Sequence, residues 1–254
     1  MGDYQRLPVI SRWMLLALGS VVEGSVNRAL DPVAGWVLRE HPSLLPSVPA
    51  PALLCTIRAR TDVVDRMLTE VVAGVRGTET KLHYWSFGGG FDARWLRMRS
   101  VLATAVTGHT EVDVPEVMRC KESLLGDSPF ANSWWEVDRR ALDEVNWSLE
   151  PVNGARPLVV LEALAGRWDS GALRSFLKRL HLEAPGALVV ASVPGWADAD
   201  RDKWSVRSLA QLGWDVVEDT RVGPRGRLMA PSGDEICPGM YPFRVVVLRG
   251  APTS

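Results

Sequence analysis

The spacing of apolar residues changes near residue 81, and this change divides the chain into two predicted zones. Apolar positions at helical spacing in the first zone predict helices over residues 13–30, 33–40 and 61–75. Asp31 and Pro32 are the predicted N-cap and first residue of the second of these helices. We therefore expect an N-terminal helical cap over residues 1–80 and a core over residues 81–254, which together form one structural unit.

The second zone alternates short apolar runs with amphipathic stretches. The runs predict strands over residues 82–87, 110–114, 133–138, 157–164, 186–194, 214–220 and 241–250. Helices are predicted between them over residues 91–106, 115–125, 170–184 and 201–213. Strand–helix alternation of this kind predicts an α/β fold with a doubly wound, seven-stranded, mostly parallel sheet, whose last two strands form a hairpin-like pair.

Composition excludes several classes of partner. The net charge is −1, so neither nucleic acid nor an anionic membrane is an expected partner. No run of about 20 apolar residues is present, so no membrane span is predicted. The three cysteines are far apart and form no metal-ligand spacing, which predicts no metal site and a reducing, cytoplasmic location.

Three consecutive glycines follow the first predicted strand of the core. Gly88, Gly90 and Ala93 fit the pattern G-x-G-x-x-[GA], in which missing side chains let a ligand lie against the backbone. Asp113 ends the next strand, 23 residues beyond Gly90, where a carboxylate can bind two ribose hydroxyls. These features predict a nucleotide-like ligand, and the alternative is a tight structural turn beside a surface aspartate.

Both a nicotinamide cofactor and S-adenosylmethionine would suit such a site. None of the three tyrosines has a lysine four residues later, which disfavours a short-chain reductase. The chain also lacks the Gly-Lys-Ser/Thr of a P-loop and the Gly-x-Ser-x-Gly of an α/β-hydrolase. The hairpin-like end of the sheet favours a class I methyltransferase over a dehydrogenase.

Six segments in order resemble the leucine carboxyl methyltransferase family, including its bacterial branch of natural-product O-methyltransferases. The segments are DPVAGWVL, IRARTDVVDRML, FGGGFDAR, EVDVPEVMRCKESLL, WEVDRRALDEVNW and LVVLEAL. The fourth, which resembles Glu-x-Asp-x-Pro-Glu-Val followed by Lys and Leu-Leu, is the most specific. The resemblance implies a Rossmann-like class I methyltransferase fold, S-adenosylmethionine as cofactor and S-adenosylhomocysteine as product.

The resemblance also implies a role for each matching residue. Arg60 would bind the carboxylate of the cofactor's methionine moiety, and Asp113 would bind the ribose. Asp138, with Arg139 beside it, would accept a hydrogen bond from the adenine amino group, and Glu162 would face the cofactor's amino group or the acceptor. The floor of the site would consist of Gly88, Gly89 and Gly90. A surface ion pair for Arg60 and a helix cap for Asp138 remain the alternatives.

The chain departs from the family after the fourth strand. EALAGRW stands where the family has Glu-Gly-x-x-x-Tyr-Leu, so Arg167 and Trp168 replace a tyrosine and a leucine near the acceptor. Arg167 would bind an anionic acceptor or be solvated. The N-terminal helices and the connection over residues 221–240 are expected to line the acceptor pocket.

The predicted activity is in-line transfer of a methyl group to a carboxylate of a small-molecule or peptide acceptor. A carboxylate is ionised at neutral pH, with a pKa of about 4, and needs no general base. No histidine is placed as a base, and His41, His109 and His181 are expected at the surface. The alternatives are a cofactor-bound cyclase, isomerase or binding protein that transfers no methyl group, and a nicotinamide-dependent oxidoreductase.

Overall fold

A computed structural model describes residues 31–42, 51–135, 138–141, 149, 154–162, 170–194, 206–222 and 243–251. The helix predicted over residues 13–30 and most of the 221–240 connection lie outside the described residues, as do Arg167 and Trp168.

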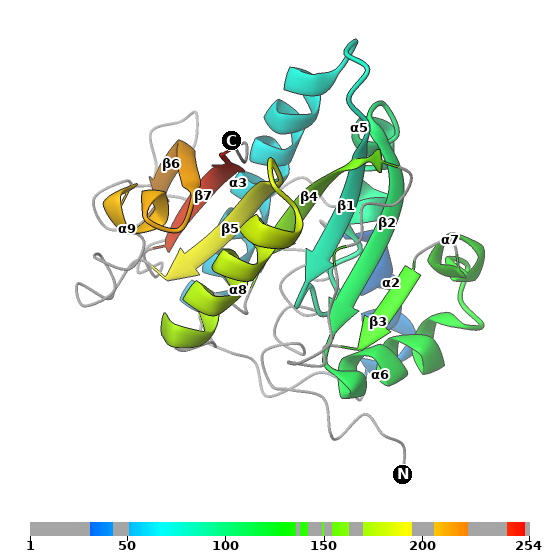
Figure 1. Ribbon diagram of the computed structural model, residues 1–254. Helices are drawn as coiled ribbons and strands as arrows, with labels where there is room; N and C mark the ends of the chain where they lie inside the picture. The colour runs from blue at the N-terminus through cyan, green and yellow to red at the C-terminus, as the bar shows by residue number, and fades with distance from the viewer. Residues whose placement is uncertain are drawn as a thin grey trace, which may run out of the picture.

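Seven strands form a single sheet in the order β3-β2-β1-β4-β5-β7-β6 (Figure 1). They are β1 (Leu82–Phe87), β2 (Val106–Asp113), β3 (Asp138–Ala141), β4 (Arg156–Leu161), β5 (Leu188–Pro194), β6 (Trp214–Val222) and β7 (Phe243–Gly250). The pairs from β3 to β5 are parallel, and β7 runs antiparallel to both β5 and β6. The predicted seven-stranded, mostly parallel sheet is confirmed.

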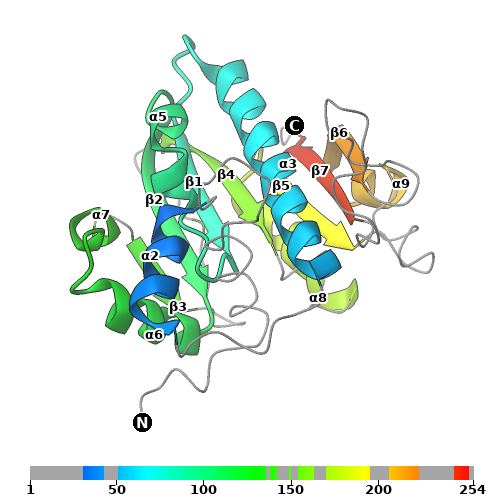
Figure 2. The same ribbon diagram turned by 180° about the vertical axis from the view of Figure 1, so that it is seen from behind.

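Helices cover both faces of this sheet. They are α2 (Pro32–Glu40), α3 (Pro51–Val75), α4 (Arg94–Arg97), α5 (Arg99–Leu102), α6 (Pro115–Leu125), α7 (Ala131–Trp135), α8 (Ser170–Glu183) and α9 (Val206–Ala210). One apolar core joins α8 and α9 to one face, and a second joins α3 and α5 to the other. Figure 1 shows α8 in front of the sheet, and Figure 2 shows α3 in front of it from behind.

The alternation of buried strands and amphipathic helices explains this layering. All six residues of β1 are buried, as in a strand covered on both faces. In α3, Val64, Met67, Leu68 and Val72 face the second core, which matches the periodicity of the sequence. The helix begins at Pro51, ten residues before the predicted start, and it packs on β5 and β7. The division at residue 80 stays a prediction.

The predicted third strand was wrong. The strand predicted over residues 133–138 is helix α7 up to Trp135, and β3 begins only at Asp138. Aromatic residues favour strands because they pack well on a half-buried sheet, not because their backbone prefers to be extended, and the tryptophan pair was therefore misleading. The polar stretch Asp138–Ala141 forms the edge strand instead, by pairing with Thr110–Asp113 of β2.

The helix predicted over residues 91–106 is divided into α4 and α5. Met98 lies between them at φ −100° and ψ 16°, outside the helical region. Before α4, the Ala93 N–H donates to the Asp31 carboxylate and not to a helical carbonyl, and after α5 the chain enters β2 at Val106. The break at Met98 and the start of β2 at Val106 therefore shorten the helix that the sequence pattern predicts.

Candidate cofactor site at the carboxyl edge of the sheet

The turn after β1 needs glycine at each position for a reason within the protein. Gly88 and Gly90 have φ of +66° and +57°, a left-handed conformation that residues with a Cβ atom seldom adopt. A Cβ atom on Gly89 would lie 2.7 Å from the Oγ atom of Ser86. The three glycines thus allow the chain to reverse tightly against the end of its own strand.

Both polar groups of the Gly90 backbone are bound by side chains. Its N–H donates to Asp113 Oδ2 at 2.8 Å, and its carbonyl accepts from Lys121 Nζ at 2.6 Å. The other carboxylate oxygen, Asp113 Oδ1, accepts from the Val114 N–H at 2.7 Å, and Gly88 N–H donates to the Val112 carbonyl at 2.8 Å. The glycine turn and Asp113 are therefore in direct contact, and Asp113 fixes the shape of the turn.

Beneath the turn lies a buried ion pair between Glu111 of β2 and Lys121 of α6. Burial raises the pKa of Glu111 to about 7, although the nearby Lys121 ammonium acts in the opposite direction. Asp113 and Asp92 add to the rise because they are negative neighbours. The pair connects α6 to the turn through the second hydrogen bond of Lys121.

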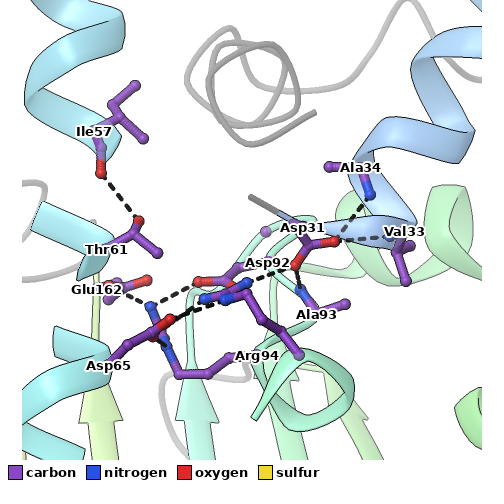
Figure 3. A network of polar contacts seen from close by, with 12 residues as sticks. Asp31, Val33, Ala34, Ile57, Thr61, Asp65, Asp92, Ala93, Arg94 and Glu162 are labelled. Atoms are coloured by element: carbon purple, nitrogen blue, oxygen red, sulfur yellow. Dashed lines mark hydrogen bonds and ion pairs between the residues drawn. The ribbon is translucent and has the colours of Figure 1, made fainter. Parts of the chain in front are cut away.

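A network of six charged side chains adjoins the turn, and we call it the Arg94 network. Its members are Asp31, Asp65, Asp92, Arg94, Arg97 and Glu162. Figure 3 shows that they come from the start of α2, from α3, from the turn and α4, and from the end of β4. Segments up to 68 residues apart in sequence are thereby joined at one point.

Arg94 is the centre of this network and is only 2% exposed. Its guanidinium lies 2.5 Å from Asp65 Oδ1, 2.7 Å from Asp92 Oδ2 and 2.9 Å from Glu162 Oε1. An arginine suits this position because its planar group has five N–H donors and stays charged when buried.

Arg97 binds a second group of carboxylates. Its guanidinium lies 2.6 Å from Asp31 Oδ2, 2.8 Å from Asp92 Oδ1 and 2.9 Å from Asp65 Oδ2. Asp31 is the confirmed N-cap of α2, because its Oδ1 atom accepts from the Val33 and Ala34 N–H groups. The same side chain therefore begins a helix and binds the glycine-turn segment.

Four carboxyl groups in this network face two guanidinium groups. Burial and the negative charge of Asp92 raise the pKa of Asp31. Burial would also raise the pKa of Asp92, but Arg94 and Arg97 together hold it well below its ordinary value. The pKa values of the two carboxyl groups thus move in opposite directions, because Asp92 lies between both arginines and Asp31 contacts only Arg97.

Two of the predicted binding residues have buried polar atoms without a hydrogen-bond partner among the described residues. Arg60 of α3 has Nε and Nη2 in this condition, and Glu162 has Oε2. Glu162 follows β4 directly, and its N–H donates to the carbonyl of Phe87 at 3.4 Å, so it lies beside the glycine turn. Cationic donors and an anionic acceptor that lack partners are suited to the charged groups of a ligand.

The remaining predicted residues are placed in part. Asp138 and Arg139 begin β3, opposite Thr110 and Glu111 of β2, and it is Ala141 at the end of β3 that lies opposite Asp113. Nothing further is described of their side chains, and Arg167 and Trp168 lie outside the described residues.

Sequence reasoning missed most of the Arg94 network. Only Asp31 and Glu162 were singled out, the first as a helix cap. Asp92 and Arg94 alternate with the buried apolar residues Phe91 and Ala93. Charged residues within an apolar run indicate buried ion pairs, and this signal was present in the sequence.

His109 was expected at the surface, and this was wrong. Both of its ring nitrogens are buried, and the ring packs against Tyr84 and Trp95 at centroid distances of 4.7 and 6.0 Å. Burial, followed by the charges of Lys121 and His83, lowers its pKa well below the ordinary value. Such a neutral, enclosed imidazole is poorly placed to exchange protons with a substrate.

The described residues contain no cluster of three or more His, Cys, Asp or Glu side chains that could bind a metal ion. Within the same part of the chain, every helix is too short or too polar to cross a bilayer.

The position of the last strand decides the fold. The strand order reverses at β1, which lies between β2 and β4, and the antiparallel β7 is inserted between β5 and β6. The chain has the fold of a class I methyltransferase. In such a fold the glycine turn after β1 and Glu162 after β4 lie at the switch point, where open α/β sheets bind their ligands.

No protein-family model and no curated protein sequence matches the chain. Solved structures with the class I methyltransferase fold do match. The glycopeptide N-methyltransferase MtfA, complexed with S-adenosylmethionine, is 13% identical over 73% of this chain and 87% of its own, with a TM-score of 0.46.

The methyltransferase domain of bacterial CtHen1 is 17% identical over 73% of this chain and 98% of its own, with a TM-score of 0.46. The [4+2]-cyclase SpnF is 14% identical over 74% and 82%, with a TM-score of 0.45. Similarity at this level gives no information on what this chain binds or does.

Proposed function

We propose that the protein is an S-adenosylmethionine-dependent O-methyltransferase whose acceptor is a carboxylate of a small molecule or peptide. The observation that carries the proposal is the glycine turn at the switch point of the sheet, bonded to Asp113 through the Gly90 N–H. This turn and this acid are the two features that an adenosine-containing ligand needs at that edge. The resemblance to leucine carboxyl methyltransferases supports the choice of a carboxylate.

The polar atoms without partners fit the charged groups of this cofactor. Arg60, whose Nε and Nη2 make no hydrogen bond to the described part of the chain, would hold the carboxylate of the methionine moiety. Glu162 Oε2 would accept from the amino group, and Asp113 would accept from the ribose through its remaining lone pairs. Asp138 would bind the adenine amino group, with Arg139 beside it.

When bound, S-adenosylmethionine supplies a methyl group on a positively charged sulfur, which is already an excellent leaving group. The chain's own contribution is therefore to position the reactants and to exclude water. Arg94 holds the Glu162 side chain at 2.9 Å, and Lys121 and Asp113 hold the backbone of the turn. An acceptor carboxylate is ionised at neutral pH, which agrees with the neutral, buried state of His109.

Calorimetric titration with S-adenosylhomocysteine tests the cofactor site. We expect micromolar binding that is lost in Asp113→Ala and Gly90→Val, since the first removes the turn's acceptor and the second places a side chain at φ +57°. Asp127→Ala changes an exposed acid just after α6 and is the matched control. Absence of binding to a folded wild-type protein would contradict the methyltransferase assignment.

The acceptor class needs a separate assay. The protein is incubated with a methyl-tritiated donor and a panel of carboxylic acids and phenols, and the products are treated with alkali. A methyl ester releases volatile methanol and a methyl ether does not, so volatile counts support carboxyl methylation. Cofactor binding without any transfer would favour the cyclase, isomerase or binding-protein alternative. Binding of NADH, followed by its fluorescence, would favour an oxidoreductase.

A further inference from the structure

A cleft of about 590 Å³ lies between α8 and the turn that leads from α9 into β6. The α8 side contributes Arg174, Ser175, Lys178, His181 and Leu182, and the other wall consists of Gln211, Leu212 and Gly213. The apolar core of α8 is on the opposite face of the sheet from that of α3, which contributes Asp65 to the Arg94 network. Figures 1 and 2 show α8 and α3 on opposite sides of the sheet.

The cleft is basic, and none of the described residues that line it is acidic. Arg174, Lys178 and His181 recur at helical spacing on one face of α8, over a length of about 10 Å. Within the described residues none of the three forms an ion pair, whereas Arg179, on an adjacent face, binds Glu183 at 2.6 Å. No described acidic side chain therefore neutralises the positive charge of this face, whereas Arg179 and Glu183 neutralise each other on the adjacent face.

This arrangement is unfavourable for the isolated helix. Like charges at i, i+4, as in Arg174 and Lys178, destabilise a helix. The helix dipole favours a basic residue in the last turn, which explains His181, but Arg174 lies two turns earlier. A bound anion would convert the repulsion into a favourable interaction.

The second wall makes the surface concave. Gly213 has φ +85°, and a Cβ atom there would lie 2.4 Å from His181 Nε2. The imidazole can therefore lie directly against the backbone of the turn, with Trp214 packed edge-on at 5.8 Å. Gln211 adds an amide to the basic side chains, so the cleft has donors on both walls.

We infer that this cleft binds a small ligand that carries two or more phosphate groups. Arginine binds phosphate oxygens in a bidentate manner, and lysine binds them as a point charge. Two anionic groups about one helical turn apart would match Arg174 and Lys178, while a single anion would leave one of them unneutralised. The two-walled shape and the net charge of −1 favour a compact ligand over a nucleic-acid strand.

Calorimetric titration of the full chain with sodium tripolyphosphate tests this inference at low salt. We expect saturable binding that weakens steeply between about 50 and 200 mM salt. The double variant Arg174→Gln/Lys178→Gln should bind about tenfold more weakly or not at all. Arg179→Gln, which removes one positive charge from the same helix outside the cleft, is the matched control and should bind as the wild type does.

Circular dichroism and thermal melting establish that each variant is folded. Absence of tripolyphosphate binding to the wild type, or an equal loss in Arg179→Gln and in the double variant, would overturn the inference. A single-stranded oligoribonucleotide is titrated in parallel. Binding of the oligonucleotide through Arg174 and Lys178 without binding of tripolyphosphate would also overturn it, in favour of a nucleic-acid surface.

Discussion

Arg94 is the residue on which the polar interior depends most. Its replacement by Met would leave the carboxylates of Asp65, Asp92 and Glu162 without their shared partner. Removal of one partner from a buried ion pair costs about 3–5 kcal/mol, and we expect a loss of unfolding free energy of that order for Arg94→Met. Urea unfolding measures it.

Arg66→Met is the control for this variant. Arg66 lies on the exposed face of α3, 4.0 Å from Glu70, and its loss should change stability by less than about 0.5 kcal/mol. Similar costs for the two variants would mean that the Arg94 network contributes no more than a surface pair.

Gly89 allows a test of steric fit in the turn. Gly89→Ala should lower the unfolding free energy by about 1 kcal/mol, because the new Cβ atom would lie 2.7 Å from Ser86 Oγ. Ser86→Ala removes that oxygen and leaves Ser86 Cβ, 4.0 Å away. The double variant should therefore recover most of the loss, and a double-mutant cycle by urea unfolding measures the coupling. Additive effects would show that Ser86 is not the obstacle.

At the scale of elements, the Glu111–Lys121 pair joins β2 to α6 and makes stability depend on pH. The pKa of Glu111 rises from 4.5 to about 7 on folding. Over that interval the folded state binds more protons than the unfolded state, so this group's contribution to stability is present below pH 4.5 and is lost as the pH rises through about 7.

Glu111→Gln should therefore lose less stability than the wild type between about pH 5 and pH 8, since the amide cannot ionise. Urea unfolding at several pH values measures the two slopes, and their difference isolates Glu111 from the other acids. Equal slopes for the two proteins would mean that Lys121 keeps the Glu111 carboxylate ionised throughout this pH range.

Elements were predictable where one local pattern determined them. The runs at β1, β4 and β7 are mostly apolar and buried, and their apolar residues do not follow a helical spacing. Prediction failed at α4, α5 and β3, where the conformation depends on partners distant in sequence. Arg94 and Arg97 bind acids from α2 and α3, and β3 is a strand because β2 offers an edge.

At the scale of the whole molecule, cofactor binding should stabilise the complete sheet. A ligand at 100 times its dissociation constant adds about 2.7 kcal/mol, which for a chain of this size raises the melting temperature by roughly 5–10 °C. We expect a shift of that size with S-adenosylhomocysteine in a thermal melt, and none in Asp113→Ala. An equal shift in both proteins would mean that the ligand binds elsewhere.

The topology and the edge that carries the candidate site could be predicted from the sequence, because the glycine turn and Asp113 mark consecutive strand ends. The interior of the site could not. Lys121, Asp65 and Arg97 are common on helix surfaces, and only the packing of α3, α4 and α6 around the turn turns them inward. The Lys121–Gly90 and Arg97–Asp65 contacts span 31 and 32 residues, and a local pattern does not record them.

The bonds of Asp31 to both α2 and the segment after the glycine turn also bear on the order in which the chain folds. A nine-residue helix such as α2 is unstable in isolation, and its N-cap is joined to the Ala93 N–H across 62 residues. The helix can therefore persist only after the turn beyond β1 has formed, so its amides should exchange with solvent only through opening of the sheet. Hydrogen-exchange protection along α2 would then measure the stability of the glycine turn after β1, although the two segments are far apart in sequence.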